Sequence, residues 1–289
     1  MAIALAIAAS LLFGTADFLG GFATKRARTI PVVIFSQLMG LAIACVVAGS
    51  FTPHASVHVA DLAWGAAAGL AGGAGLGIFY RALGAATMGI VAAVTGVATA
   101  VVPVVVGLSL GEHPGLVPLA GVALAAVAIL LVSAAITPAT ERSVRQLGAA
   151  IPPRALGAAI IAGCCFGTFY VLIRNAGPGA GIWPLAAARG ASVSLYLVAG
   201  LVARQSLRVP RAALPVIVGA GALDMVANIS FLLAAHRNGA LLVVVGTLAS
   251  LYPVTTIVLA RIVLRERLSG LQSLGLALAG GAIVLISAG

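Results

Sequence analysis

The chain has 289 residues, of which 62% are hydrophobic and 8% are charged. Soluble domains carry roughly 25% charged residues because their surfaces must be hydrated, so this composition excludes an ordinary soluble domain and favours a membrane protein. The formal net charge is +10, but the cations fall singly or in threes between apolar runs. A nucleic-acid partner would need them clustered on one wettable face with stacking aromatics, so none is expected.

Apolar runs interrupted by charges, proline or glycine predict an all-α membrane protein with ten transmembrane helices. Each span needs about 20 apolar residues, and ten of them with short loops account for the whole length. In chain order the predicted helices cover residues 2–23, 30–50, 61–81, 87–110, 115–136, 155–174, 181–203, 213–235, 240–263 and 269–288. The first run lacks the basic segment of a secretory signal, so we expect it to be retained as a span.

The chain is predicted to consist of two similar halves, residues 1–138 and 155–289, joined by a linker loop at 139–154. The linker is the longest interruption and combines charges with Pro152-Pro153. Phe13-Gly14-Thr15 matches Phe166-Gly167-Thr168 at an offset of 153 residues. Further matches, at offsets of 150 and then 154, are Gly89, Gly96 and Pro103 with Gly239, Gly246 and Pro253, and Glu112, Gly121 and Ser133 with Glu266, Gly275 and Ser287.

Five helices in each half imply that two fused copies cross the membrane in opposite directions. Inverted repeats of this kind are typical of secondary transporters, whose binding sites lie near the membrane midplane between the repeats. The sequence therefore predicts two inverted five-helix repeats around a central site.

The loop cations predict the orientation. Alternate loops hold 13 of the 16 cations, whereas the opposite loops hold only Arg174 and Arg237, and Arg189 falls within a span. Cation-rich loops stay cytoplasmic, so we expect a multi-pass protein of the plasma (inner) membrane with both termini external. The 13 cations are Lys25, Arg26, Arg28, Arg81, Arg142, Arg145, Arg154, Arg204, Arg208, Arg211, Arg261, Arg265 and Arg267.

Together these features resemble the drug/metabolite transporter superfamily, specifically proteins with two EamA-like domains. The resemblance rests on the five-plus-five helix count, on the aromatic–Gly pairs Phe13-Gly14 and Phe166-Gly167, on Pro103 and Pro253, and on the turns GEHPG at 111–115 and RERLS at 265–269. The family's usual Trp before the first glycine is Phe13 here. Its arginine in the second helix of each repeat is matched by Arg189 but is absent near Ser36-Gln37. The resemblance implies a solute transporter, often an exporter, with the fifth and tenth helices at the periphery.

Two acids, Asp17 and Asp224, lie within predicted spans. A charge at the bilayer centre costs about 2.5–3.5 kcal/mol on the insertion scale, so each should face an aqueous cavity, pair with a cation or carry a proton. Asp224 lies near the middle of its helix, with Asn228 one turn later on the same face. We interpret this pair as a candidate site for a substrate amine or a coupling proton, with an internal structural pair as the alternative.

Asp17 lies nearer the predicted cytoplasmic end of its helix, where Lys25 or Arg26 offers a structural partner. A role in substrate or proton binding and a role in such a pair are both open for it. Arg189 is a candidate anion binder, or the counter-ion of Asp17 or Asp224.

Tyrosines and small residues within the spans give weaker signals. Tyr80, Tyr170 and Tyr252 are candidate cavity residues, although aromatic side chains are also common at membrane interfaces. The other tyrosine, Tyr196, carries the same ambiguity. Gly69, Gly73 and Gly77 repeat every four residues, which predicts close helix packing. Pro103 and Pro253 predict kinks at equivalent places in the two halves.

Catalytic and metal-binding patterns are few. There is no HExxH zinc motif and no nucleotide-binding P-loop, so we expect neither an enzyme nor ATP-driven transport by this chain alone. His54 and His58 follow Pro53 in a loop without a third ligand nearby, so no metal and no cofactor are expected. The sequence thus favours a secondary transporter for a small metabolite or drug-like solute, and the resemblance implies outward transport. A lipid-carrier flippase and a membrane-embedded accessory or enzyme subunit remain alternatives, and a homodimer is left open.

Overall fold

The structure is a computed structural model that describes residues 1–85, 88–134, 153–264 and 270–288. The described residues form helices and connecting turns, without a strand. The predicted linker at 139–154 falls almost entirely outside the described residues, as do Glu266 and the RERLS turn. The helices are α1 Ala2–Thr24, α2 Thr29–Phe51, α3 Val59–Ala85, α4 Met88–Ser109, α5 Leu116–Ala134, α7 Pro153–Arg174, α8 Trp183–Val202, α9 Leu214–Ala235, α10 Leu242–Ala249, α11 Tyr252–Leu264 and α12 Gly270–Ser287.

Nine of the ten predicted helices correspond to single helices, but the ninth is divided. In place of one helix at 240–263, α10 and α11 are separated at Ser250 and Leu251. Pro253 has no N–H, so it cannot bond to the carbonyl of Ala249, and its ring opposes a continuous helix at this point. The single continuous helix predicted here is therefore wrong, although one apolar span still runs across the break. Pro103, in contrast, lies within a continuous α4.

Seven described segments are long and apolar enough to cross a membrane, one of which runs across the break from Leu242 to Leu259. Shorter apolar helical stretches cover Val94–Ser109, Leu116–Leu131 and Ser273–Ser287. Large apolar side chains remain exposed on the outer faces of the bundle, among them Val46, Val198, Ile262 and Val284. An exposed apolar surface of this extent is suited to lipid and not to water.

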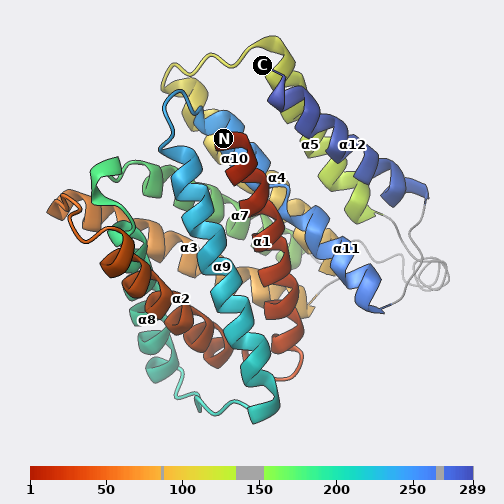
Figure 1. The fold of residues 1–289 in the computed structure, drawn as a ribbon. Coiled ribbons are helices and arrows are strands. Elements are labelled where there is room, and N and C mark those ends of the chain that lie inside the picture. Colours follow the sequence, from red (N-terminus) through yellow and green to blue (C-terminus); the bar gives the residue numbers. More distant parts are fainter. Residues whose placement is uncertain (86–87, 135–152, 265–269, 289) are drawn as a thin grey trace.

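The helices form one bundle in which distant parts of the chain lie side by side (Figure 1). α3 packs on α7 and α8, and α9 packs on α1 and α2. α4 packs on α7, while α10 and α11 pack on α1 and α4. α5 and α12 pack against each other at one edge, the peripheral position that the resemblance implies for the fifth and tenth helices.

Glycines on α3 allow it to approach α8 closely. A methyl group added at any of four glycines, each one turn from the next, would lie within 3.0 Å of a residue of α8. The facing pairs are Gly65–Pro184, Gly69–Ala188, Gly73–Ser192 and Gly77–Tyr196. The glycine spacing thus predicts the packing seen in the structure, and small residues serve the same purpose in other membrane helices.

The two prolines take part in reciprocal contacts between α4 and the divided span. A methyl group at Gly96 would lie 2.5 Å from Cγ of Pro253, and one at Gly246 would lie 2.6 Å from Cβ of Pro103. Gly96 and Pro103 are the residues that correspond to Gly246 and Pro253 at the 150-residue offset. The same contact is therefore made twice, with the two halves exchanging roles.

Candidate functional site

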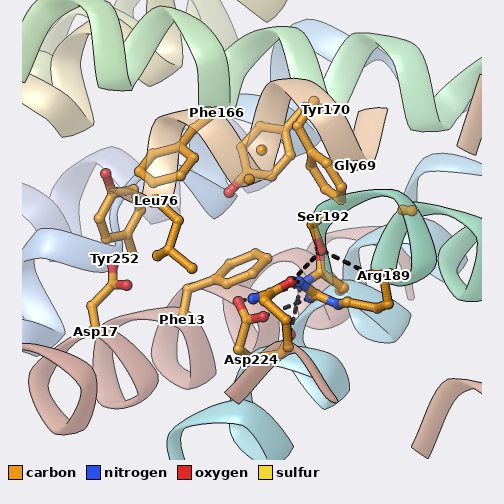
Figure 2. Close-up of a pocket in the computed structure, with 16 residues that line it drawn as sticks. Phe13, Asp17, Gly69, Leu76, Phe166, Tyr170, Arg189, Ser192, Asp224 and Tyr252 are labelled. Atoms are coloured by element: carbon orange, nitrogen blue, oxygen red, sulfur yellow. Dashed lines mark hydrogen bonds and ion pairs between the residues drawn. The ribbon is translucent and has the colours of Figure 1, made fainter. Parts of the chain in front are cut away.

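A cavity lies halfway along the helices, among α1, α2, α3, α7, α8, α9 and the start of α11 (Figure 2). The space open to the centre of a water molecule is about 70 Å³, several times what a single water requires. Two large apolar clusters flank it. One includes Phe231 and Leu248, and the other includes Phe79 and Ile217.

On one side of the cavity, Arg189 is held by a network of polar side chains. Its Nη2 atom donates to Oδ2 of Asp224 at 2.6 Å, and its Nη1 atom donates to Oε1 of Gln37 at 2.5 Å. Ser192 donates to the same Gln37 oxygen at 2.8 Å. Arg189 is buried, with 8% of its surface exposed, and Asp224 supplies the opposite charge that a buried guanidinium requires.

Asn228 supports Asp224 from the same helix. Its Nδ2 atom donates to the Asp224 carbonyl at 2.6 Å and lies 3.4 Å from Oδ1 of the carboxylate. The spacing of four residues places both side chains on one face of α9. Of the two counter-ions that the sequence leaves open for Arg189, the structure pairs it with Asp224.

Asp17 lies on the other side of the cavity, beside Tyr252 and across the Phe13 ring from the Arg189–Asp224 pair (Figure 2). It makes no hydrogen bond or ion pair with any residue that the structure describes. Arg26, one of its two predicted structural partners, stacks its guanidinium on the Phe22 ring, 4.4 Å from the centroid. Asp17 therefore contributes a carboxylate to the cavity without a cation beside it.

Aromatic rings form much of the remaining lining. Tyr170 is central among them. Its ring lies 6.1 Å from that of Phe13, 6.0 Å from that of Phe169 and 4.2 Å from that of Phe231, measured between centroids. Tyr252 is also buried, and its hydroxyl makes no hydrogen bond of acceptable geometry with the described residues. These rings give the cavity an apolar wall beside its charged groups.

Of the three tyrosines predicted as cavity residues, Tyr170 and Tyr252 line this cavity and Tyr80 does not. Tyr80 is buried beside Gly20 and borders a separate hollow near Lys25 and Arg81. Tyr196 does not line this cavity either, and its hydroxyl donates to the Gly73 carbonyl at 2.7 Å.

Sequence reasoning did not select Gln37, Ser192 or Phe169, all of which line the cavity. The repeat offset contains a signal for Gln37, because residue 37 plus 152 is residue 189. Gln37 thus occupies the position that corresponds to Arg189 in the other half of the chain. Its neutral side chain accepts a hydrogen bond from Arg189.

A second polar cluster joins the ends of α4, α7 and α9 to the start of α10. Glu112 accepts hydrogen bonds from Nη1 of Arg174 at 2.5 Å and from the N–H groups of Leu242 and Val243 at 2.8 and 2.9 Å. A carboxylate at this position satisfies free N–H groups and opposes the positive end of the helix. Glu112 thus caps a helix that belongs to the other half of the chain.

Neighbouring groups extend this cluster. Asp61 accepts from the N–H groups of Gly177 at 2.7 Å and His58 at 2.9 Å. The Nε2 atom of His236 lies 3.2 Å from the Arg174 carbonyl. Burial lowers the pKa of His236, and the nearby Arg174 guanidinium adds to this effect, although hydrogen bonding to the carbonyls of Arg174 and Ala176 opposes it.

The segment Gly107–Gly111 (GLSLG) has the G-x-S-x-G spacing of a nucleophile elbow. Its serine lies at the end of α4 and not between a strand and a helix, which is the context that the motif requires. The Ser109 hydroxyl donates to the Val105 carbonyl at 2.7 Å. We therefore assign no catalytic role to Ser109.

Comparison with known proteins adds two findings. The family model described as the EamA-like transporter family matches residues 153–288. Fifteen chains of solved structures are similar to this chain. One of them, titled "Crystal structure of protein", has a TM-score of 0.77 at 17% identity, over 99% of this chain and 96% of its own. The fold is thus shared along the whole length, and no match was found among curated proteins.

Proposed function

We propose, from the match of the EamA-like transporter family over residues 153–288, that this chain is a member of the drug/metabolite transporter superfamily. We further propose that it is a secondary transporter of a small metabolite or drug-like solute. Transport does not use ATP, and its direction is export, as the resemblance to the superfamily implies. The protein lies in the plasma (inner) membrane with both termini external.

The proposed architecture is ten transmembrane helices in two inverted five-helix repeats. It is supported by the helix contacts, which come in pairs that exchange the halves: α3 with α7 and α8, and α9 with α1 and α2. It is also supported by the contacts of Gly96 with Pro253 and Gly246 with Pro103. In these two contacts the glycine of each segment meets the later proline of the other, so the two segments run in opposite directions. A two-fold axis in the membrane plane requires this arrangement of equivalent helices.

The observation that carries the proposal is a cavity at the middle of the helices, lined by residues of both halves of the chain, among them Asp17, Arg189 and Asp224. Intramembrane charges that face a cavity mark substrate and ion pathways, and secondary transporters bind their substrates at the midplane between repeats. Among the described lining residues the cation is Arg189, already paired with Asp224. This arrangement does not suit the phosphate of a lipid carrier, so it favours a solute over the flippase alternative.

The proposal is tested with the purified full chain in proteoliposomes. Vesicles preloaded with each member of a library of amines, amino acids, organic acids and neutral solutes are diluted into the same labelled solute, with and without a pH gradient. At least one solute is expected to exchange faster than in protein-free vesicles, without added ATP. If no member of a broad library exchanges above that background under either condition, the proposal fails.

A further inference from the structure

We infer that the cavity binds a small monovalent organic cation that carries an aromatic or other apolar group, with its ammonium held by Asp17. The transport of this cation rests on the proposed function, whereas its binding follows from the cavity itself.

The charges of the lining select a cation. The described lining residues include Asp17, Asp224 and Arg189 as charged groups. Arg189 and Asp224 neutralise each other through a contact of 2.6 Å, so the remaining charge is the negative one of Asp17. No described residue gives Asp17 a hydrogen bond or an ion pair. A bound ammonium supplies the opposite charge that this carboxylate lacks.

The uncharged lining selects an apolar group on the same molecule. The rings of Phe13, Phe166, Phe169, Tyr170 and Tyr252 border the cavity. An ammonium is attracted to the faces of such rings, and the apolar part of the ligand is excluded from water among them. A hydrated inorganic cation would not use these contacts.

Tyr252 favours a primary ammonium, because this group can donate to the tyrosine as well as to the carboxylate. The residue is 3% exposed, and its hydroxyl lacks a hydrogen bond of acceptable geometry with described residues. Thr99 is the nearby polar side chain; its hydroxyl donates to the Thr95 carbonyl at 2.7 Å and can only accept from Tyr252, which leaves the tyrosine oxygen free to accept from a ligand. Figure 2 places Tyr252 beside Asp17. One ammonium has three N–H donors, enough to reach both groups.

The Arg189 network argues against anions and zwitterions. Both Nη atoms of Arg189 already donate, to Asp224 and to Gln37. A guanidinium has five N–H donors, so a ligand carboxylate could still reach Arg189, but it would add a third negative group to a lining whose described residues already hold Asp17 and Asp224 against one cation. An amine should therefore bind more tightly than the amino acid with the same side chain.

The test uses four probes that share a phenyl ring and differ in charge: 2-phenylethylammonium, phenylalanine, 3-phenylpropionate and 2-phenylethanol. Binding to the purified full chain in detergent at neutral pH is measured by isothermal titration calorimetry and by the shift in melting temperature. The ammonium is expected to bind at least tenfold more tightly than each of the other three. Tighter binding of phenylalanine or of 3-phenylpropionate overturns the inference.

Asp17→Asn should reduce the affinity for 2-phenylethylammonium at least tenfold. The matched control is Thr15→Val, on the same helix, since the Thr15 hydroxyl donates to the Leu11 carbonyl and does not line the cavity. Undiminished affinity in a folded Asp17→Asn protein overturns the inference. If that variant does not fold, Tyr252→Phe decides: it should weaken ammonium binding severalfold and leave 2-phenylethanol unchanged, and equal affinities for the ammonium before and after the change overturn the inference.

The binding measurement separates this inference from the proposed function. Specific binding of the ammonium without exchange of any solute in proteoliposomes would contradict transport and support the binding site. Exchange of an anionic or zwitterionic solute, with no binding of the ammonium, would support transport and overturn the inferred substrate class.

Discussion

At the scale of single residues, Asp224 has two roles to separate: it neutralises the buried Arg189, and it lines the candidate site. Asp224→Asn keeps an oxygen that accepts from Arg189 but leaves the guanidinium without its counter-ion. We expect the variant to insert and fold but to lose transport, or to lose the pH dependence of transport. Exchange in proteoliposomes across a pH series measures this. A well-folded variant with undiminished uptake and an unchanged pH profile would contradict the role of Asp224.

A second substitution separates the functional role from a structural one. Gln37 already accepts from Arg189 at 2.5 Å, so Gln37→Glu in the Asp224→Asn background returns a carboxylate to the guanidinium from the opposite helix. The double variant should recover the melting temperature lost through the unpaired charge. If it also recovers transport, Asp224 serves only as a counter-ion.

His236 provides a pH-dependent contribution to stability. Burial holds its pKa in the folded protein below the ordinary value, so the unfolded chain takes up the proton first as the pH falls below about 6.5. Above that pH the histidine is neutral in both the folded and the unfolded chain and does not reduce the free energy of unfolding. As the pH falls from there toward the lowered pKa, the protein loses stability. We expect His236→Gln to reduce the fall in melting temperature between neutral and mildly acidic pH. A fall as steep as in the unmodified protein would contradict this assignment.

The candidate site shows what sequence reasoning at the residue scale can achieve. Asp17, Arg189 and Asp224 stand out because charged residues within apolar runs are costly. Their pairing depends on how each helix is rotated about its axis, which the hydropathy of the spans does not encode. The same limit applies to the tyrosines. Tyr80 and Tyr170 give the same weak signal in the sequence, but only Tyr170 lies on a helix face that lines the cavity.

At the scale of elements, the approach of α3 to α8 depends on glycine. Gly69→Ala would place a methyl group against the backbone of Ala188, so it should lower the melting temperature by separating the two helices. Gly190→Ala, on α8, is the matched control because no atom lies within 4 Å of the added methyl group. This control should be neutral or stabilising, since alanine is the better helix former by about 1 kcal/mol. Equal melting temperatures for the two variants would contradict the packing role of Gly69.

The helix boundaries could be predicted from the sequence because apolar runs and their interruptions are strong signals. The break at Ser250 and Leu251 could not be predicted in this way. Pro103 and Pro253 are equivalent in the repeats and remove the same backbone donor. One is accommodated within α4, and the other lies beside the break between α10 and α11. Which outcome occurs depends on the surrounding helices and so cannot be predicted from the proline alone.

At the scale of the whole molecule, the distribution of cations gives a test of orientation. Ser56 lies in the loop between α2 and α3, and Arg208 lies in the loop between α8 and α9, and both are exposed. In a background without Cys45, Cys164 and Cys165, Ser56→Cys should react with a membrane-impermeant maleimide added to intact cells. Arg208→Cys should react only after the membrane is opened. Labelling of Arg208→Cys from outside intact cells would reverse the proposed topology.

The Glu112 cluster has a consequence for the populations of conformations. Its hydrogen bonds join the start of α10 to Arg174 at the end of α7, so they are present only while these segments are together. Hydrogen bonds to charged groups contribute about 1.5–3 kcal/mol each, and every 1.4 kcal/mol changes an equilibrium roughly tenfold. Glu112→Gln should therefore shift the resting population toward conformations that are open at this end of the bundle. The shift is measured as faster alkylation, from that side, of a Leu76→Cys reporter in the cavity. An unchanged alkylation rate would show that the cluster does not affect the equilibrium between conformations. A faster rate would make Glu112→Gln useful for structure determination, because it would enrich the conformation that is open at this end of the bundle.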